Sequence, residues 1–179
     1  MTCERTLPLT LRPAALVDAP GIAALIESGY RGEESKRGWT TEAHLVGGQR
    51  TSIEEVAQII AAPDSDMFVA EMDGELVGCF HVEARANREA YLGMLTVRPG
   101  LQGQGVGRSL VSKAEHEARV RWGATGMRMQ VIRQRDELIA WYERLGYHPT
   151  GDTLPFPHEH PGVITKRRDL EFVVLSKPI

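Results

Sequence analysis

The chain has 179 residues, of which 42% are hydrophobic and 25% are charged, as is typical of a globular protein. Its length suits one domain, and we expect residues 1–179 to form a single one. A formal net charge of −3 argues against a nucleic-acid partner, because sequence-independent binding to nucleic acid needs clustered lysines and arginines. No stretch approaches the roughly 18 apolar residues of a membrane span, and two cysteines, Cys3 and Cys79, imply no disulfide framework. We therefore expect a cytoplasmic protein with no nucleic-acid or membrane partner.

The first 63 residues combine strand and helix signals with one long loop. Leucines at every second position of residues 7–11 predict a strand. Apolar residues at helical spacing predict a helix over residues 19–30, with Asp18 as its N-cap. Residues 31–51 carry four glycines and no long periodicity, which predicts a loop with a short helical turn. Ser52 and Glu55 then form a capping box before a short helix.

The middle of the chain reads as strands. Asp73 and Gly74 separate two apolar runs, residues 66–72 and 75–84, and an Asp-Gly pair in that setting predicts a hairpin because both turn residues tolerate positive φ. A further strand is expected over residues 90–97. Gly93 interrupts it and indicates either a bulge or a close approach of another group.

The second half alternates helices and strands. Helices are expected over residues 106–122 and 135–145, and strands over residues 126–132, 147–153 and 170–176. Residues 155–169 form a proline-rich loop before the last strand. The element order predicts a mixed α/β domain.

The stretch VRPGLQGQGVGRSLV, residues 97–111, places glycines at the start of a predicted helix. A dinucleotide fingerprint fails because Arg108 occupies the third glycine position, and a P-loop fails because no Lys-Ser or Lys-Thr pair follows. Glycines at a helix N-terminus expose backbone N–H groups that can bind an anion such as a pyrophosphate. The alternative is a tight turn that only joins a strand to a helix.

The run from Gln102 to Gly107, QGQGVG, resembles the Q/R-x-x-G-x-G/A element of the GNAT superfamily of N-acetyltransferases, and the segment WYERLGY follows it downstream as in that family. The resemblance extends over most of the chain. It implies a mixed, mostly antiparallel sheet of six to seven strands with a central splayed parallel pair, flanked by about four helices. It also implies that acetyl-CoA, the cosubstrate, lies between the strands at residues 90–97 and 126–132.

The resemblance assigns the cofactor contacts to two short segments. Backbone groups of the strand end would pair with the pantetheine arm, and backbone amides of the glycine run would hold the pyrophosphate. Arg108 and Ser109 would reach phosphate oxygens, although Arg108 suits a solvated surface position equally well. The residues expected to bind acetyl-CoA are Leu95, Thr96, Val97, Gln102, Gly103, Gln104, Gly105, Val106, Gly107, Arg108 and Ser109.

Acetyl transfer to an amine needs an acid for the leaving thiolate and a base for the amine. The resemblance assigns the acid to Tyr142, which periodicity alone would place in the core. Many relatives carry Asn where Arg135 begins this helix, so the geometry around Tyr142 departs from the family pattern. His81 and Glu83 share one face of a strand and are candidate bases, or else belong to an exposed polar face.

Trp39, Glu42 and His44 form a second candidate group, in which an aromatic ring and a carboxylate hold a cationic amine. Solvated loop positions are the alternative. Together with Glu33 and Glu34, Glu42 favours a cationic acceptor. His158, Glu159 and His160 lack the ligand spacing of known zinc sites, and we expect no metal.

The sequence therefore predicts an acetyl-CoA-dependent N-acetyltransferase that acts on a primary amine of a small molecule or peptide. A catalytically weak CoA-binding sensor is the alternative, and a nucleotide-binding regulator is a third hypothesis. A homodimer is compatible with the family. The acceptor loops do not identify the amine, and the motifs do not exclude acyl groups other than acetyl.

Overall fold

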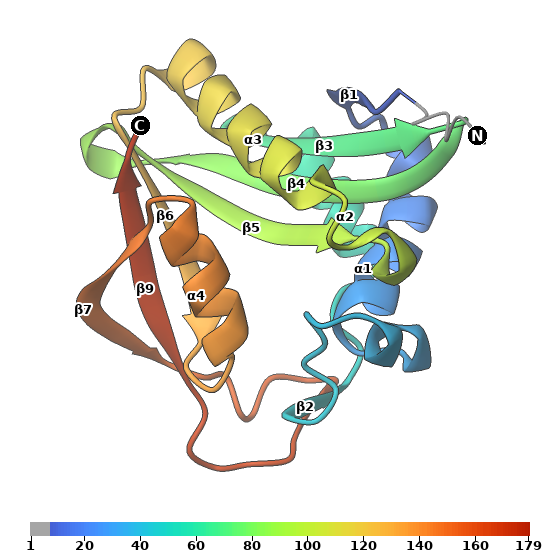
Figure 1. The fold of residues 1–179 in the computed structure, drawn as a ribbon, viewed down its shortest axis with the longest axis vertical. Helices are drawn as coiled ribbons and strands as arrows, with labels where there is room; N and C mark the ends of the chain where they lie inside the picture. Colours follow the sequence, from blue (N-terminus) through green and yellow to red (C-terminus); the bar gives the residue numbers. More distant parts are fainter. Residues whose placement is uncertain (1–7) are drawn as a thin grey trace, which may run out of the picture.

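A computed structural model of the protein describes residues 8–179, and its ribbon is shown in Figure 1. Leu7, in the predicted first strand, and Cys3 lie outside the described residues. The hairpin prediction is confirmed, whereas the predicted capping box forms only in its Ser52 half, because the Glu55 carboxylate accepts from the Thr51 hydroxyl instead. Asp73 and Gly74 adopt φ values of 55° and 78° between two paired strands, and the Ser52 hydroxyl accepts a hydrogen bond from the Glu55 amide at 3.1 Å. Asp18 stands at the N-cap of the first long helix, but its side chain binds Arg12 and the Ala15 amide and makes no cap hydrogen bond.

A seven-stranded sheet forms the centre of the molecule. Its order in space is β1 (Thr10–Pro13), β3 (Ser65–Met72), β4 (Glu75–Arg85), β5 (Glu89–Val97), β6 (Gly126–Ile132), β9 (Glu171–Pro178) and β7 (His148–Pro155). All neighbouring strands are antiparallel except β5 and β6. The predicted fold class, a mostly antiparallel sheet with one central parallel pair, is confirmed.

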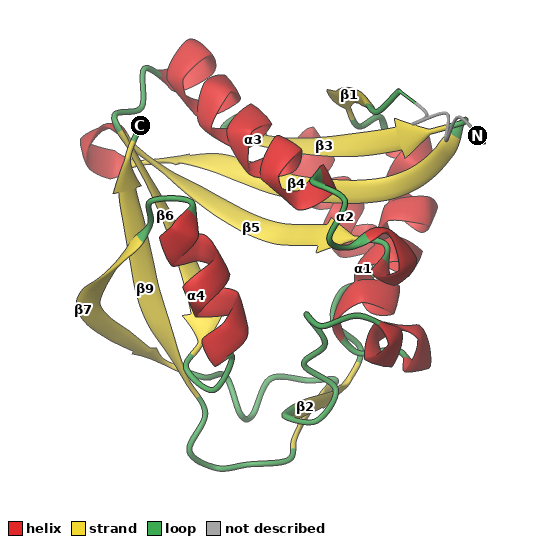
Figure 2. Ribbon diagram, in the orientation of Figure 1, coloured by secondary structure: helices red, strands yellow, loops and turns green. Residues whose placement is uncertain are grey.

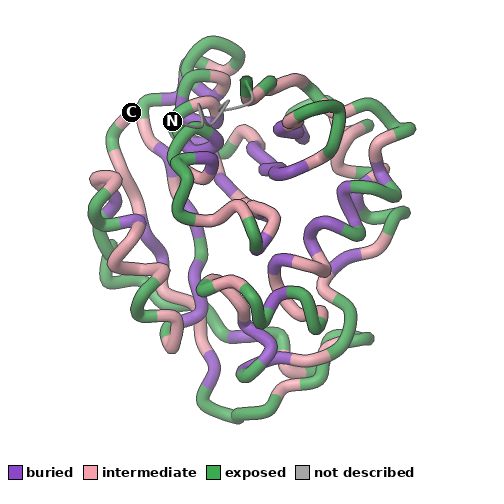
Figure 3. Tube along the Cα trace, turned by 45° about the vertical axis from the view of Figure 1, so that its right-hand side comes forward, coloured by how far each residue is buried: buried purple, intermediate pink, exposed green. Residues whose placement is uncertain are grey.

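Helices cover both faces of this sheet (Figure 2). They are α1 (Ala19–Tyr30), α2 (Ile53–Ala61), α3 (Val106–Trp122) and α4 (Asp136–Arg144). Successive residues of β3 point to opposite faces, as in any strand: Phe68 packs in the core with α3 and α4, whereas Met67 and Val69 pack with α1 and α2. The sheet therefore separates two apolar layers. The buried stretches of the chain are purple in Figure 3, and the exposed stretches are green.

The two parallel strands separate soon after they pair. Their register covers only residues 89–91 of β5 and 126–128 of β6, and Figure 1 shows the strands diverging beyond it. Between Cys79 and His81 the register with β4 shifts, so that two residues of β5, Met94 and Leu95, face one residue of β4. This bulge, with Met94 at a φ of 50°, bends β5 away from β6.

Gly93 directly precedes this bulge, so the register supports the first of its two interpretations, a bulge. A Cβ atom on Gly93 would lie 2.9 Å from the Tyr91 ring. The position therefore excludes a side chain because Tyr91 lies against it.

The two predicted loops contain a small sheet that periodicity did not indicate. Strands β2 (Val46–Gly48) and β8 (Val163–Thr165) pair in antiparallel register, which joins residues 31–51 to residues 155–169. The joined loops cover a third apolar cluster, formed by Leu45, Val46, Ile132, Phe156 and Leu170. Both loops are thereby held at the open end of the splayed strands (Figure 1).

Candidate active site

Two cavities meet at the splayed strands. The first, of about 310 Å³, is lined by the glycine run and by the end of β5, and we call it the glycine cavity. The second, of about 460 Å³, is lined by the joined loops and by Arg31, Arg50 and Arg135, and we call it the arginine cavity. Their shared wall consists of Tyr30, Leu95, Arg135, Leu138 and Tyr142.

The glycine cavity presents a row of free backbone amides. Gly103 and Gly105 have φ values of 84° and 85°, which an L side chain rarely adopts. Within the described part of the chain, the amides of residues 103–108 donate no hydrogen bond. Successive N–H groups in such a turn form a concave anion site. Here the site lies at the N-terminus of α3, which is the positive end of the helix dipole.

Most of the predicted cofactor residues lie in this cavity wall. Those that line it are Leu95, Thr96, Val97, Gln102, Gly103, Gly105, Gly107 and Arg108, whereas Gln104, Val106 and Ser109 do not. The Ser109 hydroxyl instead donates back to the Gly105 carbonyl at 3.3 Å. The buried Thr96 hydroxyl donates to the Met94 carbonyl, so only its backbone faces the cavity edge.

The side chain of Gln102 holds a neighbouring loop. Its Nε2 donates to the Thr40 hydroxyl at 2.7 Å, and its Oε1 accepts from the Trp39 amide at 3.0 Å. Trp39 then lies edge-on to Trp141 at 6.2 Å, and both rings line the glycine cavity. Trp39 therefore lies beside the glycine run, and the predicted group of Trp39, Glu42 and His44 is not brought together.

Tyr142 lies at the junction of the two cavities. Its side chain is 6% exposed and packs edge-on against Trp141 and Tyr147 at ring distances of 4.9 and 5.8 Å. No described residue forms a hydrogen bond with its hydroxyl. Burial raises the pKa of Tyr142, so the phenol keeps its proton and can act as a donor.

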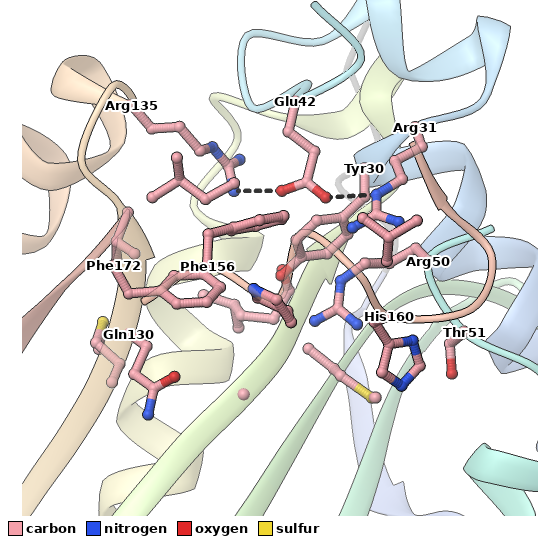
Figure 4. Close-up of a pocket in the computed structure, with 18 of the residues that line it drawn as sticks. Tyr30, Arg31, Glu42, Arg50, Thr51, Gln130, Arg135, Phe156, His160 and Phe172 are labelled. Atoms are coloured by element: carbon pink, nitrogen blue, oxygen red, sulfur yellow. Dashed lines mark hydrogen bonds and ion pairs between the residues drawn. The ribbon is translucent and has the colours of Figure 1, made fainter. Parts of the chain in front are cut away.

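An ion-paired cluster, which we call the clasp, joins three segments across the arginine cavity (Figure 4). Glu42, only 3% exposed, accepts from Arg31 Nε at 2.8 Å and from Arg135 Nη1 at 3.5 Å. Arg135 also donates to the Thr40 carbonyl. The arginine that replaces the expected Asn thus ties the start of α4 to the loop that carries Glu42.

The clasp bears on the expectation about the acceptor. The Glu42 carboxylate is already shared by two arginines, so it presents no free negative charge to a cationic amine. Glu33 and Glu34 pair with Lys36 and Arg37 on the surface and do not line the cavity. His44 is exposed and lines neither cavity. Glu42 therefore offers no unpaired carboxylate, Glu33, Glu34 and His44 lie outside both cavities, and the preference for a cationic acceptor stays a prediction.

The candidate bases His81 and Glu83 lie on one face of β4, but neither belongs to the described walls of the two cavities. His81 is buried and shares a hydrogen bond of 2.8 Å with the Ser65 hydroxyl. Burial lowers the pKa of His81, which keeps the ring neutral. Glu83 pairs with Arg85 and lies opposite Tyr91, which does line the arginine cavity.

Sequence reasoning missed Tyr30, Arg31 and Arg50. Tyr30 had the spacing of a core residue in α1, yet its hydroxyl donates to the Leu95 carbonyl at 3.1 Å, and it lines both cavities. The two arginines stand at opposite ends of a stretch that reads as a solvated loop. No local pattern distinguishes them, because their position depends on the pairing of β2 with β8.

The described residues hold neither a cluster of metal ligands nor a membrane-spanning helix. Over residues 8–179, no three His, Cys, Asp or Glu side chains are grouped as a metal ion would require. His160 lines the arginine cavity, whereas His158 packs against the Phe156 ring at 5.4 Å. Within the same residues no helix is both long and apolar enough to cross a membrane.

The comparisons with known proteins agree with the fold. Residues 34–147 match the model of the acetyltransferase (GNAT) family. The chain belongs to this family, and its activity class is therefore acyl transfer. No curated protein matches it significantly.

Solved structures of N-acetyltransferases share the fold. The ribosomal-protein-S18-alanine N-acetyltransferase of Escherichia coli is 19% identical with a TM-score of 0.72, over 96% of this chain and 94% of that one. The ribosomal-protein-alanine N-acetyltransferase of Brucella melitensis is 20% identical with a TM-score of 0.69, over 95% and 99%. The IAA acetyltransferase of Bacillus cereus is 13% identical with a TM-score of 0.69, over 96% and 100%.

Proposed function

We propose that the protein is an acetyl-CoA-dependent N-acetyltransferase that transfers the acetyl group directly to a primary amine. The observation that carries this proposal is the shared wall of the two cavities. One cavity ends in a row of free amides, the other is lined by charged side chains, and Tyr142 lies between them. A bound cosubstrate and an acceptor would therefore meet beside a buried phenol.

The glycine cavity fits the cosubstrate. The amides of residues 103–108 would hold its pyrophosphate, and Arg108 at the cavity wall, which pairs with none of residues 8–179, would reach a phosphate oxygen. The end of β5 would pair with the pantetheine arm, because β6 does not pair with this part of the strand. The positions at Gly103 and Gly105 leave open space where a Cβ would stand, as close contact with a ligand requires.

The chemistry assigns a role to each group at the junction. A neutral amine forms the new C–N bond at the thioester carbonyl, the C–S bond breaks, and Tyr142 gives its proton to the departing sulfur. An alkylamine has a pKa of about 10.4 and must lose a proton first. We propose that Glu83, beside His81 on one face of β4, accepts this proton through water, since Tyr91, its partner in β5, lines the arginine cavity.

Thermal shift measurements on the purified full chain test this proposal, with acetyl-CoA, free CoA, NAD and ATP as the ligands. The proposal expects stabilisation by acetyl-CoA and CoA alone, together with thiol release on addition of a panel of amines. Stabilisation by CoA with no thiol release from any amine would instead support a CoA-binding sensor. Stabilisation by NAD or ATP but not by CoA would support a nucleotide-binding regulator.

Three further expectations stay predictions. We propose that residues 1–179 act as one domain, that the protein works in the cytoplasm, and that it forms a homodimer. Gel filtration with light scattering tests the dimer, and limited proteolysis tests the single domain.

A further inference from the structure

Arg50 lines the arginine cavity, and its guanidinium has no hydrogen-bond acceptor among the described residues. The backbone of Arg50 is bound, but its guanidinium forms no hydrogen bond or ion pair with any described residue. Figure 4 shows this side chain pointing into the cavity with no dashed line from it, in contrast to Arg31 and Arg135. Its N–H groups are therefore available to an acceptor that a ligand brings into the cavity.

The position of Arg50 is fixed on two sides. Its guanidinium carbon lies 5.1 Å from the centre of the Tyr30 ring, a cation–π contact that uses none of its N–H groups as hydrogen-bond donors to a described acceptor. Glu27 at the same time accepts hydrogen bonds from the Arg50 and Thr51 amides, and Arg31 donates to the Gln49 carbonyl at 2.9 Å. The chain on both sides of Arg50 is therefore anchored to α1 before a ligand arrives.

The two carboxylates that line the cavity, Glu42 and Glu55, form no ion pair with Arg50. Glu42 is committed to Arg31 and Arg135 in the clasp. Glu55 is exposed and accepts from the Thr51 hydroxyl at 2.6 Å, without an ion pair to Arg50. Three arginines and two glutamates line the cavity, which leaves a formal excess of one positive charge there.

We infer that the acceptor is a primary amine that also carries a carboxylate, and that Arg50 binds this carboxylate through its N–H groups. A guanidinium fork matches a carboxylate in two parallel hydrogen bonds. The inference rests on the proposed function, because the arginine cavity must be the acceptor site. It is consistent with the pairing of Glu42 by Arg31 and Arg135, since an unpaired carboxylate in the cavity wall would repel the carboxylate of the acceptor.

The test compares matched acceptors in which a carboxamide replaces the carboxylate, with each kcat/KM referred to the neutral amine because the carboxamide lowers the pKa of a nearby amine. ω-Amino acids and α-amino acids are each paired with their carboxamides, and kcat/KM is measured by thiol release. We expect the acid to exceed its amide by about tenfold or more in at least one matched pair. In Arg50→Gln this ratio should fall to about one, and in Arg50→Lys it should lie between, because an ammonium keeps the charge but not the fork.

Arg37→Gln is the matched control, since it removes one arginine from the same loop outside both cavities and should leave the acid-to-amide ratio unchanged. The wild-type ratio tests the inference even if Arg50→Gln fails to fold. Thiol release that is equal or faster with the amides overturns the inference and leaves the N-acetyltransferase proposal standing. Absence of thiol release with every amine overturns both.

Discussion

The two cavities on either side of Tyr142 are built in opposite ways. The glycine cavity takes its polar surface from backbone amides of one continuous segment, residues 103–108. The arginine cavity takes its polar surface from side chains of α1, both joined loops and the start of α4. Backbone amides suit a cosubstrate that is the same for a whole family, whereas side chains on loops can be exchanged without disturbing the sheet. This contrast suggests separate tests for each cavity and for the residue between them.

The largest effect is expected at the shared wall. Tyr142→Phe removes the proposed proton donor and should lower kcat by about 100- to 1000-fold, with little change in the dissociation constant of acetyl-CoA. Tyr147→Phe is the matched control. Tyr147 is buried and donates to Glu115 at 2.9 Å, but it lines neither cavity. Its loss should reduce stability and leave kcat near that of the wild type; equal kcat in the two variants would contradict the role of Tyr142.

The clasp gives the next largest effect, on stability and on the arginine cavity. Glu42→Gln leaves Arg31 and Arg135 facing each other without a shared carboxylate, and breaking a buried ion pair in this way costs about 3 kcal/mol. Chemical denaturation measures the loss, and the KM of the acceptor should rise more than that of acetyl-CoA. Glu34→Gln removes an exposed pair and should change stability little. A similar loss in both variants would refute the clasp.

A smaller effect is expected from the glycine cavity. Gly105→Ala places a Cβ at a φ of 85°, where an L residue is strained by about 1–2 kcal/mol, so the affinity for CoA should fall by about tenfold. Isothermal titration measures it. Gly100→Ala introduces the same methyl group at ordinary φ, with no heavy atom within 4 Å. If Gly100→Ala weakens CoA binding as much as Gly105→Ala, the proposed amide row is not the pyrophosphate site.

The smallest effect concerns the pH profile of kcat/KM. The raised pKa of Tyr142 means that the folded protein loses this proton only above the ordinary phenol value of about 10. The rate should therefore rise with pH as the amine is deprotonated and should show no descending limb below about pH 10. A descending limb between about pH 8 and 10 that vanishes in Tyr142→Phe would show an ordinary phenol instead.

Local patterns were sufficient wherever neighbouring residues decide the conformation. The Asp73-Gly74 turn, the Ser52 cap and the glycine turn depend on the φ freedom or hydrogen-bonding capacity of residues close in sequence. The family resemblance supplied the mixed sheet with its parallel pair, and the bulge at Met94 that bends β5 needed the register with β4. The pairing of β2 with β8 was not predicted, since three-residue strands carry too little periodicity.

The sequence by itself determined the family, the fold class and the glycine segment proposed to hold the cosubstrate. Only the tertiary structure decided the charge that an acceptor meets. The sequence offered Glu42 as a candidate to hold a cationic amine, whereas the structure pairs it with Arg31 and Arg135. The sequence carried no signal for Arg50, which the structure places against the Tyr30 ring. The physical reason is distance along the chain. Backbone conformation is set by near neighbours, whereas the partner of a charged side chain is set by whichever distant segment the fold places beside it.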